Sequence, residues 1–125
     1  MLKKIKLENM LFLDIETVPL FAKYSELDET TKLLWEQKTN YQRKDEFTPK
    51  EFYDRAGIWA EFGKIVCISV GHFVFTGDIR NFRVKSFFGE EKDILNDFKN
   101  LLEKHFSKPY HLLCAHNGKE FDFPF

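Results

Sequence analysis

The sequence has little of what marks several protein classes. It holds two cysteines among 125 residues, with no Cys-x-x-Cys pair and no Cys/His spacing of a zinc ligand set. We therefore expect Cys67 and Cys114 to be reduced core residues. No apolar stretch approaches transmembrane length, and Asp14 and Glu16 interrupt the only apolar run near the amino terminus. Neither a membrane span nor a signal peptide is indicated, so a cytoplasmic location is expected.

An excess of charge of one sign is also missing. Nineteen Lys and Arg stand against 20 Asp and Glu, which gives a formal net charge of −1. This balance argues against a protein that coats duplex nucleic acid, although an enzyme that holds a strand end through metal ions stays open. Hydrophobic residues make up 43% and charged residues 31%, which predicts a single globular domain over residues 1–125.

The most informative stretch runs from Met10 to Thr17, where apolar residues lead directly into two carboxylates. Side chains alternate across a β-strand, so Asp14 and Glu16 share one face while Leu11, Leu13 and Ile15 share the other. At the end of an apolar strand, desolvation and mutual repulsion both oppose two ionised carboxylates unless they share a cation, and a hard ion such as Mg²⁺ or Mn²⁺ prefers carboxylate oxygens. The alternative is that the strand emerges into water and both acids are solvated.

A second stretch near the carboxyl end repeats this pattern. A short apolar strand at 111–115 leads through Asn117 and Gly118 to Asp122, at a predicted helix start. Asp14-Ile15-Glu16-Thr17 resembles the first motif of the DEDD 3′–5′ exonucleases, and Asn117-x-x-x-Phe121-Asp122 is similar to their second. Together with the segment 61–71, both are most similar to the exonuclease domains of family B DNA polymerases and their stand-alone relatives.

The resemblance implies an α/β protein of the ribonuclease H-like fold. It implies that Asp14, Glu16 and Asp122 bind two Mg²⁺ or Mn²⁺ ions and carry the removal of nucleoside monophosphates from DNA 3′ ends. Single-stranded DNA is the expected partner, because an unpaired end reaches the site without the cost of unpairing. The resemblance also implies substrate contacts by Thr17, Asn117 and Phe121, with core packing as the alternative for Phe121.

The third motif of this family, Tyr-x-x-x-Asp, does not follow Asp122, and the chain ends at Phe125. The resemblance therefore covers the front part of the family's domain, and we expect this chain to be inactive or weak as a nuclease. We also expect an open sheet edge beside 111–115 and exposed phenylalanines at 121, 123 and 125, which would favour self-association. The alternative function is a catalytically incompetent nuclease remnant that binds nucleic acid or a protein.

The remaining segments predict how the rest of the chain is organised. A helical insertion at about 20–60 should contain one helix from a Ser25 cap to about Lys38, a polar loop at 39–47, and a helix that starts at the Thr48 to Glu51 capping box. A hairpin is expected over 64–75 and 79–88, and an amphipathic helix over 90–106. The ribonuclease H-like fold that the resemblance implies has three antiparallel strands, extended by a parallel one. On the hairpin, Arg80, Arg83 and Lys85 either contact phosphates or form a solvated edge.

Overall fold

A computed structural model describes residues 5–125. Its contacts divide the chain into two compact units, one formed by the chain up to Glu16 together with Ile65–Phe125, and one formed by Thr17–Lys64. We call them the sheet unit and the helical unit. The elements in chain order are a 3₁₀ turn (Leu7–Asn9), β1 (Met10–Pro19), a 3₁₀ turn (Tyr24–Glu26), α1 (Glu29–Arg43), α2 (Pro49–Phe52), a 3₁₀ turn (Tyr53–Ile58), β2 (Gly63–Thr76), β3 (Ile79–Phe88), α3 (Glu91–His105) and β4 (Leu112–Cys114).

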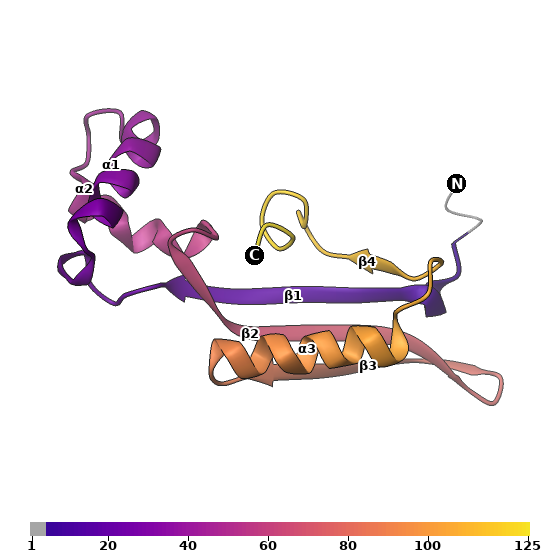
Figure 1. The fold of residues 1–125 in the computed structure, drawn as a ribbon. Helices are drawn as coiled ribbons and strands as arrows, with labels where there is room; N and C mark the ends of the chain where they lie inside the picture. The colour runs from indigo at the N-terminus through magenta and orange to yellow at the C-terminus, as the bar shows by residue number, and fades with distance from the viewer. Residues whose placement is uncertain (1–4) are drawn as a thin grey trace. The chain divides into compact units, whose positions relative to one another are not determined.

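The four strands form one mixed sheet in the order β3-β2-β1-β4. β2 and β3 are an antiparallel hairpin whose last pair joins Thr76 to Ile79, so the turn is Gly77-Asp78, with a positive φ of 63° at Gly77. β1 runs opposite to β2 (Figure 1), and β4 is parallel to β1, with Leu11 paired to Leu113. The predicted pattern of three antiparallel strands and one parallel strand is confirmed.

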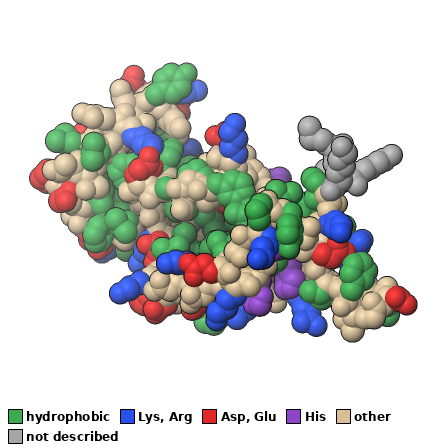
Figure 2. Space-filling view, turned by 45° about the vertical axis from the view of Figure 1, so that its right-hand side comes forward, with side chains coloured by type: hydrophobic (Ala, Val, Ile, Leu, Met, Phe, Trp, Pro, Cys, Tyr) green, Lys and Arg blue, Asp and Glu red, His purple; other side chains and the backbone are tan. Residues whose placement is uncertain are grey.

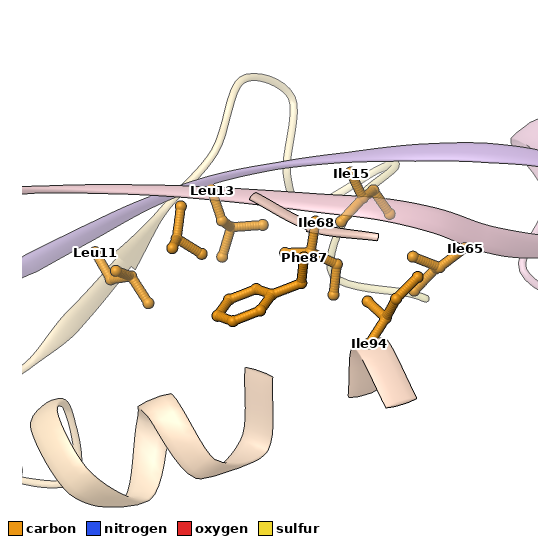
Figure 3. Close-up of a cluster of buried hydrophobic side chains, with 8 residues drawn as sticks. Leu11, Leu13, Ile15, Ile65, Ile68, Phe87 and Ile94 are labelled. Atoms are coloured by element: carbon orange, nitrogen blue, oxygen red, sulfur yellow. The ribbon is translucent and has the colours of Figure 1, made fainter. Parts of the chain in front are cut away.

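The core of the sheet unit forms because β1 has a large aliphatic side chain at every second residue, on the face that packs against α3. Leu11, Leu13 and Ile15 are all buried, and Ile94 of α3 is fully buried against them. Figure 3 shows this cluster between the strands and α3. Burying each such side chain contributes about 1.5 to 3 kcal/mol. The predicted helix over 90–106 is confirmed, with acids in its first turn and Lys104 and His105 in its last, which complement the helix dipole.

In the helical unit, α1 differs from the predicted helix at both ends. Its N-cap is Asp28, whose carboxylate accepts a hydrogen bond from the Thr31 amide at 2.7 Å, and the predicted cap Ser25 lies in a 3₁₀ turn. The helix continues to Arg43, so the predicted loop over 39–47 was wrong for its first part. Arg43 donates through Nε to the Thr39 hydroxyl, and both residues are buried. This hydrogen bond gives both buried polar side chains a partner within the last turns of α1.

Other predictions for the helical unit are confirmed or corrected in detail. The capping box is present, since the Thr48 side chain accepts from the Glu51 amide while Glu51 accepts from the Thr48 amide. Leu27 and Trp35 are buried in the core of this unit, whereas Leu34 is exposed. Trp35 also donates from its indole nitrogen to the Pro49 carbonyl, which ties α1 to the start of α2.

Two further predictions need correction. Cys67 and Cys114 are both free, but each is half-buried and not a core residue. The chain around Asp122 forms turns and not the start of a helix. Charged side chains of both signs are interspersed over the surface in Figure 2, as the balanced composition indicates. Among the described residues, no helix has the length and apolar character to cross a membrane.

Candidate active site

Asp14 and Glu16 lie on the exposed face of β1. The strand buries Leu13 and Ile15 on its other face, so the two acids are held by a strand that is fixed in the core. The alternation of the sequence predicted that the two acids share a face, and both are exposed to solvent, as the alternative of solvated acids also expects. Neighbouring carboxylates on a rigid strand can share a cation without first being brought together.

The second predicted motif reaches β1 through β4. β4 pairs in parallel with the first residues of β1, the last pair being Phe12 with Cys114. The chain then turns at Asn117, which has a φ of 53°, and the Asn117 carbonyl accepts from the amides of Glu120 and Phe121 at 3.1 Å each. This turn places Asp122 beside β1. Its carboxylate oxygen Oδ1 accepts a hydrogen bond from the Ile15 amide at 3.2 Å, in a buried position.

Gly118 makes this turn tight enough to reach β1. A Cβ atom added at Gly118 would lie 2.8 Å from the Cβ of Ala115 and 2.9 Å from the Phe123 ring, closer than such atoms pack. The Phe123 amide also donates to the Gly118 carbonyl at 2.8 Å. Glycine is therefore required at this position for space, and a larger residue would push Asp122 away from Ile15.

The three carboxylates have the right chemistry for Mg²⁺ or Mn²⁺, since these ions take oxygen ligands and seldom use soft ones. Asp14 and Glu16 flank Ile15 in sequence, and Asp122 contacts Ile15 itself, so all three belong to one short stretch of β1. Within residues 5–125, however, no three acid, histidine or cysteine side chains already form a group that could hold a metal ion. Binding a cation through all three acids therefore requires side-chain movement.

The predicted substrate-contacting residues have different surroundings. Thr17 follows Glu16 in β1, and its hydroxyl donates to the Gly57 carbonyl within the helical unit. Asn117 is exposed at the turn before Asp122. Phe121 is half-buried against the core of the sheet unit, and its ring meets that of Phe125 edge to face at 5.4 Å. These contacts give Phe121 the packing role that was its alternative.

The expected exposure of the carboxyl-terminal phenylalanines was only partly right. Phe123 is exposed, whereas Phe121 and Phe125 pack against the core and are half-buried. β4 does form one edge of the sheet, and its Leu112 and Leu113 are both exposed. The open apolar edge is therefore present, but it is smaller than the sequence indicated.

Two Tyr-x-x-x-Asp segments escaped the sequence interpretation because they precede the second motif. They are Tyr24 to Asp28 and Tyr41 to Asp45. Both lie in the helical unit, where Asp28 caps α1 and Asp45 follows its end with a φ of 60°. Asp28 thus has a capping role in α1, and Asp45 lies in a left-handed turn after it.

A cavity of about 520 Å³ lies between β3 and α3 in the sheet unit. Its lining includes Lys85, Asp97, Lys104 and His105, and it contains none of the three candidate carboxylates. The cavity is therefore separate from the candidate active site.

Comparisons of the chain with protein-family models, with curated proteins and with solved structures gave no match.

Proposed function

We propose that this chain is a metal-dependent 3′–5′ exonuclease domain of ribonuclease H-like fold, which releases nucleoside monophosphates from the 3′ ends of single-stranded DNA. The observation that carries the proposal is the hydrogen bond between Asp122 and the Ile15 amide. It brings the second motif to the middle of the first, across 107 positions of sequence. The mixed sheet and the exposure of Asp14 and Glu16 support the same function.

Asp14, Glu16 and Asp122 would hold the divalent ions. Such ions lower the pKa of a bound water and stabilise a leaving oxygen in phosphodiester hydrolysis. The chain itself supplies backbone positions for the ligands, from which their side chains would move to share an ion. β1 presents Asp14 and Glu16 to solvent, where a phosphate can approach, and the Ile15 amide fixes Asp122 beside them. Because the backbone that carries these acids is already ordered, less of the site has to become ordered when the substrate binds.

A second function is favoured by one observation. The carboxylate of Asp122 is buried and already bonded to a backbone amide, and the described residues contain no assembled metal group. A remnant that keeps the fold of a nuclease and binds nucleic acid or a protein would also have this geometry. The two functions differ in whether the chain cleaves DNA.

The test is a single-turnover assay with 5′-labelled single-stranded DNA and excess protein in Mn²⁺, conditions that detect a weak activity. We expect slow loss of single nucleotides from the 3′ end. Asp14→Asn should lower the rate about a hundredfold or more, since it removes a shared ligand. Glu36→Gln, at an exposed acid of α1 in the helical unit, is the matched control and should keep the wild-type rate.

Three outcomes would contradict the exonuclease proposal. They are internal cleavage products, an unchanged rate in Asp14→Asn, and intact DNA in the presence of a bound metal ion. The last outcome would favour the binding remnant.

A further inference from the structure

The face of the sheet opposite α3 carries a cluster of aromatic rings. Within the described part of the sheet unit, α3 is the only α-helix, and it packs on the side of Leu11 and Leu13. Phe12 points to the other side. Its ring lies 5.9 Å from that of Phe73 and 5.8 Å from that of Phe82, and these two lie 4.9 Å apart, measured between centroids. We call these three residues the aromatic platform.

Gly71 leaves room for the Phe82 ring of the platform on β2. A Cβ atom added at Gly71 would be 2.2 Å from Cζ of Phe82, so the ring rests on the bare backbone of β2. The backbone at Gly71 does not have a positive φ, unlike that of Gly77 and Gly89. Glycine is thus needed here for room and not for its conformation. The Phe82 side chain nevertheless stays about half exposed, at 49%.

A positive charge lies next to the platform. The Arg80 guanidinium is 5.9 Å from the centre of the Phe73 ring and 5.3 Å from that of Phe75, and it also pairs with Glu8 at 3.1 Å. Phe75 is exposed as well. Exposed aromatic rings and a guanidinium plane are surfaces on which unpaired bases stack, and the guanidinium can also attract a phosphate.

The platform continues directly into the candidate active site. Phe12 and Asp14 are alternate residues of β1, so their side chains share a face and lie about 7 Å apart along the strand. Glu16 follows on the same face. A strand whose terminal phosphate lies at the two acids can therefore place its preceding bases over the platform.

We propose that the aromatic platform, with Arg80, binds the unpaired bases of a single-stranded nucleic acid whose 3′ end lies at Asp14 and Glu16. The direction of the strand rests on the proposed exonuclease function, whereas the stacking of bases does not. A second copy of this chain is the less favourable occupant. A two-fold interface on this face would bury Asp14 and Glu16 close to their own copies, and burying unpaired like charges is costly.

The test measures binding in EDTA, so that no metal ion contributes and no metal-dependent cleavage occurs. The probes are a fluorescein-labelled oligothymidylate of about ten nucleotides and an abasic strand of the same length and charge, followed by anisotropy. Stacking predicts that the wild-type protein binds the oligothymidylate at least about tenfold more tightly than the abasic strand. Because this comparison uses unaltered protein, it stays decisive even if a variant fails to fold.

The variants then locate the contact. Phe82→Ala should lose about tenfold in affinity for the oligothymidylate and little for the abasic strand, while Phe82→Tyr should keep the wild-type affinity. Tyr41→Ala, at an aromatic residue of the helical unit that is 87% exposed, is the matched control and should bind as wild type. Asp14→Asn should keep its preference for bases in EDTA even where it abolishes nuclease activity, so the two proposals can fail separately.

Equal affinity for both probes would overturn the inference, as would wild-type binding by Phe82→Ala. Light scattering on the same samples tests the other occupant. A dimer that Phe82→Ala converts to a monomer, without loss of DNA affinity, would assign the platform to a second copy of the chain.

Discussion

Asp122 accepts a hydrogen bond from the backbone amide of Ile15 at 3.2 Å, although 107 positions separate the two residues. The carboxylate is 6% exposed and Ile15 is 5% exposed, so water competes little for either group. This bond joins the turn after β4 to the middle of β1. Loss of this bond should therefore lower the stability of the fold even when no metal ion is bound.

We expect Asp122→Ala to destabilise the fold by about 1 to 3 kcal/mol, because the buried Ile15 amide loses its partner. Asp122→Asn keeps an oxygen that can accept this bond, so its loss should be clearly smaller. Urea unfolding followed by circular dichroism measures both. Wild-type stability in the alanine variant would contradict the burial and bonding described for Asp122.

The stability of the sheet unit should depend on the protonation of His72. Burial lowers the pKa of His72, and the nearby charges of Arg83 and His105 lower it further. His72 is paired with Arg83 across the hairpin, and its ring meets that of Phe106 edge to face at 5.9 Å. The folded protein therefore favours the neutral imidazole.

The sign of the pH dependence follows from this shift. Below about pH 6.5 the unfolded chain takes up a proton at His72 more readily than the folded one. The stability from the neutral ring is thus fully present above that pH and is lost as pH falls toward the lower folded pKa. His72→Phe should show a smaller drop in unfolding free energy between about pH 7.5 and about pH 5.5 than the wild type. An identical drop in both proteins would contradict the role of His72.

The open edge at β4 should favour self-association. Leu112 is 42% exposed on this edge strand, and unpaired edges with apolar residues recruit other chains. Leu112→Lys should lower the apparent mass in size exclusion with light scattering, because charge on an edge strand opposes pairing. Leu33→Lys, at an exposed leucine of α1, is the control and should leave the mass unchanged. A monodisperse wild-type monomer would show that the edge is already sufficiently protected.

Features set by neighbouring residues could be predicted from the sequence. The alternation in β1 gave the faces of Asp14 and Glu16, the capping box located the start of α2, and helical spacing located α3. In each case the signal and its structural effect lie within a few residues of one another. The strand pattern of the sheet was expected from the resemblance, and the four strands have that pattern.

Features that depend on distant or competing partners could not be read in this way. Ser25 and Asp28 are both good N-caps, but Asp28 caps α1 while Ser25 lies in the preceding 3₁₀ turn. Thr39 and Arg43 look like loop residues until their mutual hydrogen bond is known. The contact of Asp122 with Ile15 depends on the pairing of β4 with β1 and on the tight turn at Gly118. The aromatic platform likewise required the hairpin register and the bare backbone at Gly71.

The most direct test of the central claim is a calorimetric titration with Mn²⁺. We expect saturable Mn²⁺ binding by the wild-type protein and loss of most of this affinity in Asp14→Asn, because the acids beside Ile15 would hold the ion. Circular dichroism should show both proteins folded, and Glu36→Gln should bind as wild type. Unchanged Mn²⁺ binding in folded Asp14→Asn, or no binding by the wild type, would contradict the assignment of the metal site.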